Sequence, residues 1–418
     1  EILSLKVCDP AMGSGAFLVA TCRFLGNLLV SAWERDGFPP EFDKSYDKDI
    51  YARRLISQRC LYGVDKNPFA VSLARLSLWL VTLSESLPFT FVDHALKCGD
   101  SLIGYSIKEI QEANREVQLG FFPELNEIQQ QLSIERQEGF SKDNRNNISY
   151  DKKKKLLDKQ IRDSEGLRQA GDIMIAAFFS KEKEKERAEK QKVYLAMLRD
   201  SEEGKGSLEP LNEIRNLLIE GERGIRPFHW DLEFPEVFGR QQKGFNIIIG
   251  NPPFAGNNTF VKSYPKNIHN WLKKIHTRSG GQCDLVAHFF RRSFNLLKKD
   301  GSIGLIATNT ISQGDTRNSA LTWICKNNGT IYSVNKNYRW PGISSVLISV
   351  VHITKKDYLG EKFINSRKVE TVSAFLTPTK QHDSPKTLFR NSNNCFQGSK
   401  PYGKGFTFDD TQFADNET

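Results

Sequence analysis

A segment near the start of the chain combines residue types that could hold a cofactor. It reads DPAMGSGAF over residues 9–17, and we call it the glycine segment. The apolar run before it predicts a strand that ends at Asp9, after which the backbone turns through Gly13 and Gly15 into a helix. A bound cofactor approaches such a turn more closely than a Cβ atom permits, so glycine is needed there. Nicotinamide and flavin enzymes use a similar turn, so the segment alone indicates a cofactor without identifying it.

A second segment, GNPPF at 250–254, has groups that could hold a planar molecule carrying an amino group. We call it the NPPF segment. Proline has no backbone N–H, so Pro252 and Pro253 leave carbonyl oxygens that only accept hydrogen bonds, and the Asn251 side chain adds another acceptor. The ring of Phe254 offers a face for stacking. The alternative, a tight turn that closes a strand, is disfavoured because the glycine segment occurs in the same chain.

The spacing of acidic residues separates the possible cofactors. In a dinucleotide-binding fold, the acid that holds the ribose lies about twenty residues beyond the glycine turn. Here the first aspartate at the end of the next predicted strand is Asp65. A dinucleotide also needs no second segment like NPPF. Both observations disfavour a nicotinamide or flavin dinucleotide.

The elements that position these segments have the alternating pattern of a parallel α/β sheet. Residues 1–104 and 225–353 alternate short apolar runs with amphipathic helices. The continuous apolar run 245–249 is typical of a buried parallel strand, which places the NPPF segment at the carboxyl edge, where open α/β sheets bind ligands. Asn67 and Pro68 are suited to begin a helix. That helix carries an apolar stripe of Phe69, Leu73, Leu76, Leu80 and Leu83.

The rest of the chain has a different texture. Residues 105–224 are rich in Lys, Glu, Gln and Arg, and KEKEKERAEKQK at 181–192 is a charge run. We expect a helical insertion that is partly disordered around Ser141 to Ser149, and both a solvated spacer and a DNA-backbone contact surface stay open for it. Residues 354–418 are polar and loop-rich. A start close to the first strand and an end without a closing element predict a piece of a longer polypeptide.

Composition sets outer limits on function. The chain has 418 residues, a net charge of +9 and a mean hydropathy of −0.48, with a pI near 9.0 that permits a polyanionic partner. No apolar run reaches transmembrane length and no signal peptide is visible, so we expect a cytoplasmic protein. The seven cysteines form no CxxC pair and the seven histidines show no ligand spacing, which argues against a disulfide framework and a metal site.

The two segments together resemble those of amino-group DNA methyltransferases that make N6-methyladenine from S-adenosylmethionine. Their order in the chain resembles the γ class of these enzymes. Within it, FHWDLEFPEVF (228–238) before FNIIIGNPPF (245–254) is similar to the Eco57I-type methylase domain. FQGSKPYGKGF (396–406) is similar to the start of the target-recognition region of MmeI-like enzymes. The resemblance covers roughly Val7 to Ile353.

The resemblance implies a fold, an activity and partners. The fold is a Rossmann-like class I S-adenosylmethionine-dependent methyltransferase sheet, with 1–104 as its cofactor-binding half, 225–353 as its catalytic half and 354–418 as the start of a target-recognition region. The activity is methyl transfer from S-adenosylmethionine to N6 of an adenine flipped out of double-stranded DNA. Such domains occur in bacterial or archaeal restriction–modification and phage-defence enzymes. Nuclease and target-recognition domains of a longer parent are further expected partners, and a membrane is not.

The resemblance also implies roles for single residues. Asp65 would hold the ribose hydroxyls and Asp100, in CGDSL, the adenine amino group of the cofactor. Trp340, in RWPGISSVLISVV, would clamp the extruded base together with Phe254, although family members usually have Phe or Tyr at the Trp340 position. The catalytic residues implied are Asn251, Pro252, Pro253 and Phe254. The cofactor-binding residues implied are Asp9, Pro10, Gly13, Ser14, Gly15, Phe17, Asp65, Lys66, Asp100 and Ser101.

The sequence differs from the resembled family in two ways, and two alternative functions stay open. The family's extra cofactor motif upstream of the first strand is absent, and so is a nuclease-type cluster of paired carboxylates with lysine, so we expect that this chain alone does not cut DNA. One rival is methylation of another amino or amide group, in protein glutamine or RNA guanine. The other is a catalytically idle cofactor-binding module that contributes DNA contacts.

Overall fold

The computed structural model divides the chain into one unit of residues 1–382 and a second of 383–418. The segment 396–406, which resembles the start of a target-recognition region, lies outside the described residues, as does part of the expected disordered stretch near Ser141. The structure describes residues 1–383 apart from positions 41, 85–88, 117–124, 141–146, 221–222, 257–258, 260 and 341–345.

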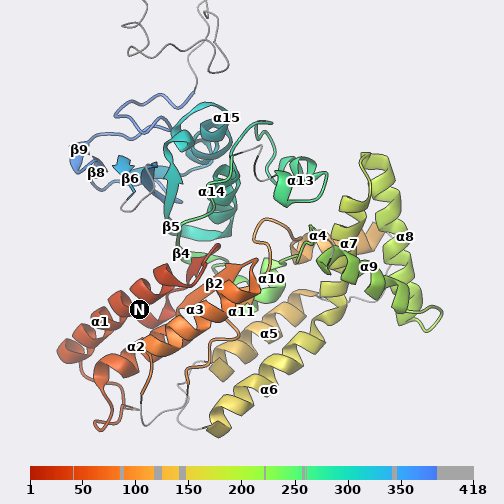
Figure 1. The fold of residues 1–418 in the computed structure, drawn as a ribbon. Helices are drawn as coiled ribbons and strands as arrows, with labels where there is room; N and C mark the ends of the chain where they lie inside the picture. The colour runs from red at the N-terminus through yellow and green to blue at the C-terminus, as the bar shows by residue number, and fades with distance from the viewer. Residues whose placement is uncertain are drawn as a thin grey trace, which may run out of the picture. The chain divides into compact units, whose positions relative to one another are not determined.

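Within the described residues, a nine-stranded sheet in the order β3-β2-β1-β4-β5-β7-β6-β8-β9 forms the centre of the first unit (Figure 1). Strands β1 to β5 pair in parallel, and β7 lies antiparallel between β5 and β6. This arrangement agrees with the predicted class I methyltransferase sheet. The strands are β1 (Val7–Asp9), β2 (Leu61–Asp65), β3 (Leu96–Cys98), β4 (Phe245–Gly250), β5 (Leu297–Thr308), β6 (Thr330–Arg339), β7 (Leu347–Thr354), β8 (Lys362–Ile364) and β9 (Arg367–Val369).

The sheet has a topological switch point between β1 and β4. Chain connections from β1 lead through β2 to β3 on one side, whereas β4 continues to β5 on the other. Ligands of open α/β sheets bind at the carboxyl ends of the strands at such a point. The glycine segment follows β1 and the NPPF segment follows β4, so the topology places both predicted segments at this position.

Three helices cover one face of the first strands: α1 (Ala16–Asp36), α2 (Lys48–Arg59) and α3 (Pro68–Val81). Contrary to our expectation, α1 is long and apolar enough to cross a membrane by length and composition. Its residues Leu18 and Leu29 are buried in the core that it shares with α2, α3 and β1. The apolar face of α1 therefore serves the packing of this layer.

The predicted start of α3 is confirmed, but its apolar stripe faces solvent. The Asn67 side chain accepts a hydrogen bond from the backbone N–H of Phe69 at 3.0 Å, with Pro68 in the first turn. The smaller residues Val71 and Ala74 face the core together with Leu78. Phe69, Leu73, Leu76 and Leu80 of the stripe are exposed on α3, and Leu83, also exposed, lies beyond the end of the helix at Val81.

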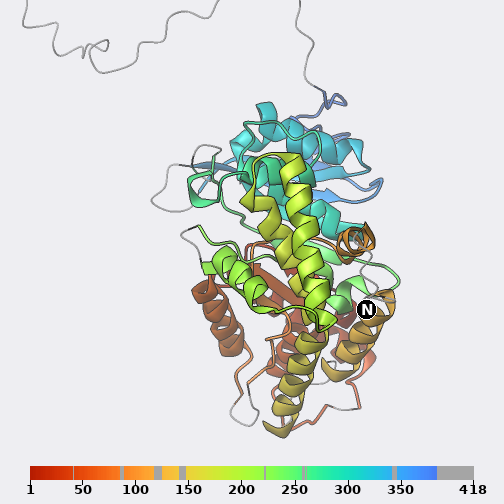
Figure 2. The ribbon, with the colours of Figure 1, turned by 90° about the vertical axis from the view of Figure 1, so that its right-hand side faces the viewer.

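The insertion at 105–224 is helical, and it is not a solvated spacer. Helix α7 buries ten residues between Leu167 and Phe178, in a core that it shares with α8 and α9. The same core includes residues of α13 (Ile268–Ile275) and α14 (Leu285–Leu296). Helices α7 and α8 run side by side (Figure 2). The charge run that suggested a spacer includes the start of α8, where Glu184 and Lys185 are exposed and Arg187 packs on the Phe178 ring. The helices are α4 (Ile107–Glu116), α5 (Leu125–Phe140), α6 (Asn147–Asp163), α7 (Glu165–Ser180), α8 (Glu184–Glu202) and α9 (Glu209–Glu220).

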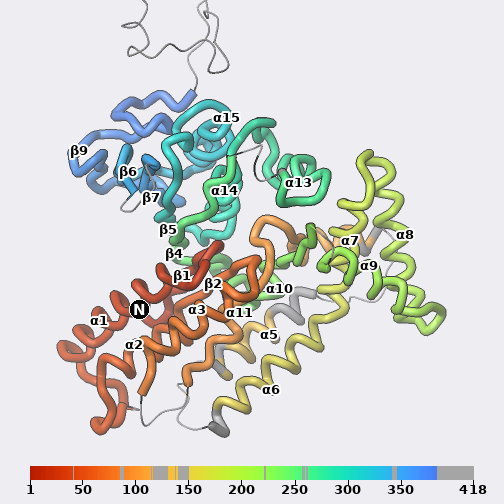
Figure 3. The backbone as a smooth tube through the Cα atoms, viewed as in Figure 1, coloured from red at the N-terminus to blue at the C-terminus, as the bar shows by residue number. Residues whose placement is uncertain are grey.

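A buried ion pair fixes the insertion to the segment 228–238, which packs against the sheet. The segment 228–238 forms two short helices, α10 (Trp230–Glu233) and α11 (Pro235–Phe238), and α5 lies beside α11 (Figure 3). Arg136 of α5 donates through Nη1 to Glu236 Oε2 at 2.9 Å and to the Glu233 carbonyl oxygen at 2.7 Å. Both side chains of the pair are 4% exposed.

The second half of the sheet has its own helical cover. Helices α13 (Ile268–Ile275) and α14 (Leu285–Leu296) lie between β4 and β5 in the chain, and α14 packs on the sheet through residues such as Phe290 and Phe294. The shorter helical elements are η1 (Ile2–Ser4), η2 (Val261–Ser263), η3 (Asn309–Ser312), α15 (Gly314–Arg317), η4 (Asn318–Thr322) and α16 (Trp323–Lys326).

Candidate active site

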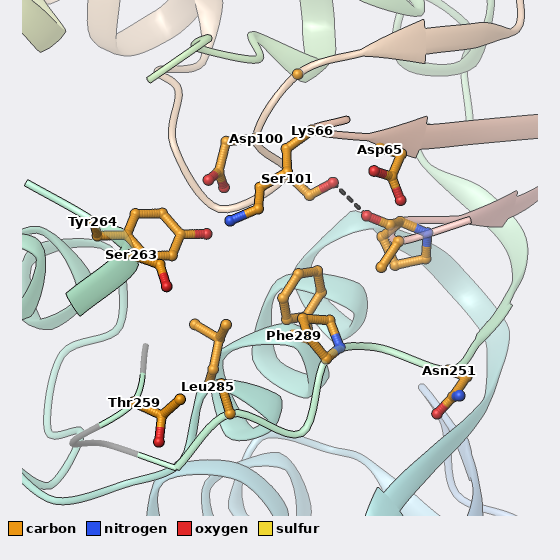
Figure 4. A pocket seen from close by; sticks show the side chains of 15 residues that line it. Asp65, Lys66, Asp100, Ser101, Asn251, Thr259, Ser263, Tyr264, Leu285 and Phe289 are labelled. Carbon is orange, nitrogen blue, oxygen red and sulfur yellow. Dashed lines mark hydrogen bonds between the residues drawn. The ribbon is translucent and has the colours of Figure 1, made fainter. Parts of the chain in front are cut away.

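A cavity of about 400 Å³ lies at the carboxyl edge of the sheet, between the glycine segment and the NPPF segment. Figure 4 shows how its lining side chains lie. The predicted site residues that line it are Pro10, Asp65, Lys66, Asp100, Ser101, Asn251 and Pro253. The predicted site residues that do not line it are Asp9, Gly13, Ser14, Gly15, Phe17, Pro252, Phe254 and Trp340.

The turn after β1 has the open backbone that the sequence predicts. Gly13 and Gly15 adopt left-handed conformations, with φ of 53° and 84°. A Cβ atom on Gly13 would meet no atom within 4 Å, so open space lies beside the turn. The turn is also tied to β2, because the Gly13 N–H donates to Asp65 Oδ2 at 2.9 Å.

Asp9 is buried at the end of β1, close to Gly250 of the NPPF segment. Its Oδ1 accepts from the Ala11 N–H at 3.0 Å, and a Cβ atom on Gly250 would lie 2.5 Å from the same oxygen. Only glycine leaves room for this approach, and its φ of 155° also disfavours a side chain. Burial raises the pKa of Asp9 to about 7, with the nearby Asp65 carboxylate adding to the shift and the Ala11 N–H opposing it.

Two further carboxylates face the cavity, one from β2 and one from the loop after β3. Asp65 accepts from the Asn67 N–H through Oδ1 at 2.8 Å in addition to its bond from Gly13. Asp100 is 6% exposed, and its Oδ1 accepts from the Leu102 N–H at 3.0 Å. Burial raises the pKa of Asp100, while hydrogen bonds from Tyr264 and Leu102 oppose the rise.

Ser101 connects the loop after β3 to the glycine segment. Its hydroxyl donates to the Pro10 carbonyl oxygen at 2.5 Å, which is the dashed line in Figure 4. The three loops that follow β1, β2 and β3 are therefore linked to one another by hydrogen bonds through Asp65 and Ser101. A cofactor bound there would meet a wall that is already ordered, which reduces the entropy cost of binding.

The NPPF segment places Asn251 at the cavity. Asn251 Oδ1 is buried and has no hydrogen-bond partner among the described residues. A buried oxygen without a partner is costly, so such an atom in a native fold calls for a ligand or water. Pro252 is buried, and Phe254 is half-buried and packs against the core cluster that contains β4 and α14.

Trp340 stands apart from this cavity. It is half-buried, directly after β6, and its backbone N–H donates to the Val346 carbonyl oxygen at 3.1 Å. Because β6 and β5 both run antiparallel to β7, the carboxyl end of β6 lies at the same sheet edge as the NPPF segment. The role of Trp340 as a clamp on the base stays a prediction.

Sequence reasoning missed several residues of the cavity wall. Leu285 and Phe289 are one helical turn apart on α14, a spacing that could have marked one face of this predicted helix. Tyr264 carries no signal in the sequence, because only the path of the chain after the NPPF segment brings it back to Asp100. The cavity residues missed are Ala11, Gly99, Ala255, Thr259, Ser263, Tyr264, Leu285 and Phe289.

The described part of the chain holds no group of three or more His, Cys, Asp or Glu side chains that could bind a metal ion. His288 instead lies in a buried chain of hydrogen bonds, with Nδ1 2.9 Å from His276 Nδ1 and Nε2 3.1 Å from Cys283 Sγ. Burial lowers the pKa of His288 to about 3, so this group remains neutral.

Two relatives of the chain are longer proteins whose names combine a restriction enzyme with a methyltransferase. A putative type II restriction enzyme and methyltransferase, RM.MjaORFECS2P of Methanocaldococcus jannaschii, is 24% identical over 345 residues, which cover 75% of this chain and 27% of the relative. The type II restriction enzyme and methyltransferase RM.Eco57I of Escherichia coli is 27% identical over 124 residues, covering 27% of this chain and 12% of its own. The chain therefore spans about a quarter or less of these relatives.

Solved structures show more distant similarity. MmeI, a type IIL restriction-modification enzyme in complex with DNA, matches 90% of this chain and 36% of its own at 14% identity, with a TM-score of 0.43. LlaGI, a type ISP restriction-modification enzyme with a DNA substrate mimic, matches 86% of this chain and 21% of its own at 10% identity, with a TM-score of 0.38.

Two family models match the sequence itself. The model of the MmeI DNA-methyltransferase domain matches residues 1–114. The model of the Eco57I restriction-modification methylase matches residues 59–337, which include Asp65, Asp100 and the NPPF segment. Because this match covers more than half of the chain, the chain belongs to the Eco57I restriction-modification methylase family.

Proposed function

We propose that the chain is the methyltransferase domain of a restriction–modification or related defence enzyme. It transfers a methyl group from S-adenosylmethionine to N6 of an adenine that is flipped out of double-stranded DNA. The family supports DNA methylation, and the observation that supports an amino group as acceptor is Asn251 Oδ1, a buried hydrogen-bond acceptor with no partner among the described residues. Adenine specificity, the cofactor and the residue roles are parts of this proposal.

The residues at the cavity suit S-adenosylmethionine. The space beside Gly13 admits the cofactor close to the backbone, Asp65 can accept from the ribose hydroxyls, and Asp100 can accept from the adenine amino group. Phe289 and Leu285 provide an apolar wall for a planar base. When bound, S-adenosylmethionine supplies an electrophilic methyl group on a sulfonium sulfur.

The NPPF segment suits the target base. The N6 lone pair of adenine is delocalised into the ring, which makes the nitrogen a poor nucleophile. Asn251 Oδ1 and the Pro252 carbonyl oxygen can each accept one N6 hydrogen, which favours a pyramidal nitrogen whose lone pair points toward the methyl group. Phe254 stacks on the ring, and Trp340 clamps it from the end of β6. This stacking offsets part of the few kcal/mol that flipping the base costs.

Removal of the Asp65 carboxylate tests the cofactor assignment. We expect Asp65→Ala to weaken S-adenosylmethionine binding by about 2 kcal/mol, or roughly 30-fold in Kd, because charge-assisted bonds to the ribose are lost. Isothermal titration calorimetry measures this change. Asp93→Ala is the matched control, since Asp93 pairs with Arg75 at 3.2 Å and does not line the cavity.

Two results would contradict the assignment. Unchanged affinity in a folded Asp65→Ala variant would remove Asp65 from the site. Binding of NAD by the wild type, without binding of S-adenosylmethionine, would overturn the cofactor itself.

The chain that follows the NPPF segment supports a DNA partner. Residues 255–283, which we call the basic segment, contain five Lys or Arg and no Asp or Glu. All five cationic side chains are exposed, and Ser263 and Tyr264 of the same segment line the cavity. Phosphates flanking a flipped base would meet this segment. The five residues are Lys262, Lys266, Lys273, Lys274 and Arg278.

Salt dependence tests this assignment. We expect the chain to bind duplex DNA weakly, with strong salt dependence and little sequence preference, because phosphate contacts dominate. Changing Lys262 and Lys266 to alanine should reduce the slope of log K against log salt by up to about 0.9 for each phosphate that is no longer neutralised. The control changes Lys243 and Lys299 to alanine, because both lie near the amino ends of β4 and β5. Equal slopes for both double variants would contradict the assignment, as would tight site-specific binding by residues 1–418.

A further inference from the structure

Tyr264 belongs to the chain that follows the NPPF segment, and it contacts residues of the proposed cofactor site. It follows the NPPF segment by ten residues and is 5% exposed. Its hydroxyl donates a hydrogen bond to the Asp100 carboxylate. Figure 4 shows its ring at the cavity wall, with the hydroxyl directed toward Asp100 and Lys66. One side chain therefore joins the chain after β4 to the loop after β3.

Lys66 packs against the same ring. Its Nζ lies 4.7 Å from the centroid of the Tyr264 ring, within the range of a cation–π interaction. Lys66 directly follows Asp65, the last residue of β2. Tyr264 is thus held by two loops of the cofactor half, through its hydroxyl by Asp100 and through its ring by Lys66.

The hydroxyl of Tyr264 can only act as a donor toward a carboxylate. Burial and the nearby Asp100 raise the pKa of Tyr264 well above its ordinary value, so the phenol stays protonated. A carboxylate has about four acceptor positions. The Leu102 N–H and the Tyr264 hydroxyl occupy two of them, and acceptor capacity remains for the amino group of an adenine.

We propose that Tyr264 is a positioning residue that orients the Asp100 carboxylate toward the cofactor's adenine and couples cofactor binding to the placement of the segment after the catalytic residues. This inference rests on the proposed function, with S-adenosylmethionine as cofactor. A cofactor held by Asp100 and Lys66 would stabilise Tyr264 in its place. Stabilised Tyr264 would in turn hold the start of the basic segment beside the base that reacts at Asn251.

The variant Tyr264→Phe tests the inference on the full chain by two measurements. Calorimetry with S-adenosylmethionine should give a Kd about tenfold higher than that of the wild type, since one hydrogen bond to a charged group is lost. Hydrogen exchange should show that S-adenosylmethionine protects residues 261–275 in the wild type and protects them much less in Tyr264→Phe. Tyr150→Phe is the control, because its hydroxyl donates to the Asp93 carboxylate at 3.5 Å outside the cavity and outside residues 261–275.

Several results would contradict the proposed role of Tyr264. Wild-type affinity in a folded Tyr264→Phe variant would overturn the positioning role. Tighter binding would also overturn it, because Tyr264 would then occupy the space that the adenine needs. If the variant fails to fold, hydrogen exchange of the wild type still decides, since no cofactor-dependent protection of 261–275 would refute the coupling. Absence of any S-adenosylmethionine binding by the wild type would overturn the proposed function and this inference with it.

Discussion

Replacing Asn251 with alanine should lower the rate of methyl transfer by roughly two orders of magnitude or more, while the affinity for S-adenosylmethionine stays unchanged. The rate falls because Asn251 Oδ1 accepts an amino hydrogen of the adenine in the transition state, and one preorganised polar contact of this kind has an effect of that size. The affinity stays because the residues proposed to hold the cofactor, Asp65 and Asp100, come from other loops.

The assay uses tritiated S-adenosylmethionine, a duplex containing adenine and the full-length parent protein, with calorimetry on the same variants. Asn212→Ala is the matched control, because Asn212 is exposed on α9, outside the basic segment, and does not line the cavity. Methylation by Asn251→Ala at the wild-type rate would show that the NPPF segment is not catalytic and would favour the idle-module rival. Label on cytosine, protein glutamine or RNA guanine would change the substrate and leave the role of Asn251 intact.

Local chemistry explains why much of this site could be predicted. Asp65 ends a strand, and Gly13 and Asn251 follow strands, whose apolar runs are visible in the sequence. The carboxyl ends of parallel strands lie at one edge of a sheet. Asn67 and Pro68 similarly mark the start of α3 by local hydrogen bonding and backbone restriction. Such patterns depend on residues that are neighbours in the chain, so they can be recognised without any knowledge of the tertiary structure.

Tertiary packing explains what could not be predicted. Tyr264 reaches Asp100 only because the chain returns across the sheet edge, and no periodicity encodes that path. The stripe that includes Phe69 and Leu80 has the spacing of a core face, yet Ala74 and the residues beside it face the core instead, because smaller side chains permit close approach to the Gly15 turn.

The packing of the insertion also could not be predicted, because its charged residues suggested exposure to solvent. The charge run at 181–192 suggested a solvated spacer, because each of its charged side chains looks suited to water. Sequence alone does not show that α7 is buried beside it or that Arg136 is enclosed. A buried cation is compatible with folding only when a partner is supplied, and Glu236 of α11 supplies it at 2.9 Å.

The free energy of unfolding should therefore fall by about 3–5 kcal/mol in Arg136→Met, since the Glu236 carboxylate would remain buried without its cation. Chemical denaturation followed by circular dichroism measures this change. Arg35→Met is the control, because Arg35 and Asp36 pair on the surface and the loss of an exposed pair has little effect on stability.

The double variant Arg136→Met with Glu236→Leu identifies the cause. Removal of both charges leaves neither member of the pair buried without the other, so the double variant should regain much of the stability that Arg136→Met loses. If Arg136→Met is as stable as Arg35→Met, the pair does not hold the insertion to the core. If the double variant loses as much as Arg136→Met, the bond from Arg136 to the Glu233 carbonyl oxygen and the packing of its side chain account for the stability instead.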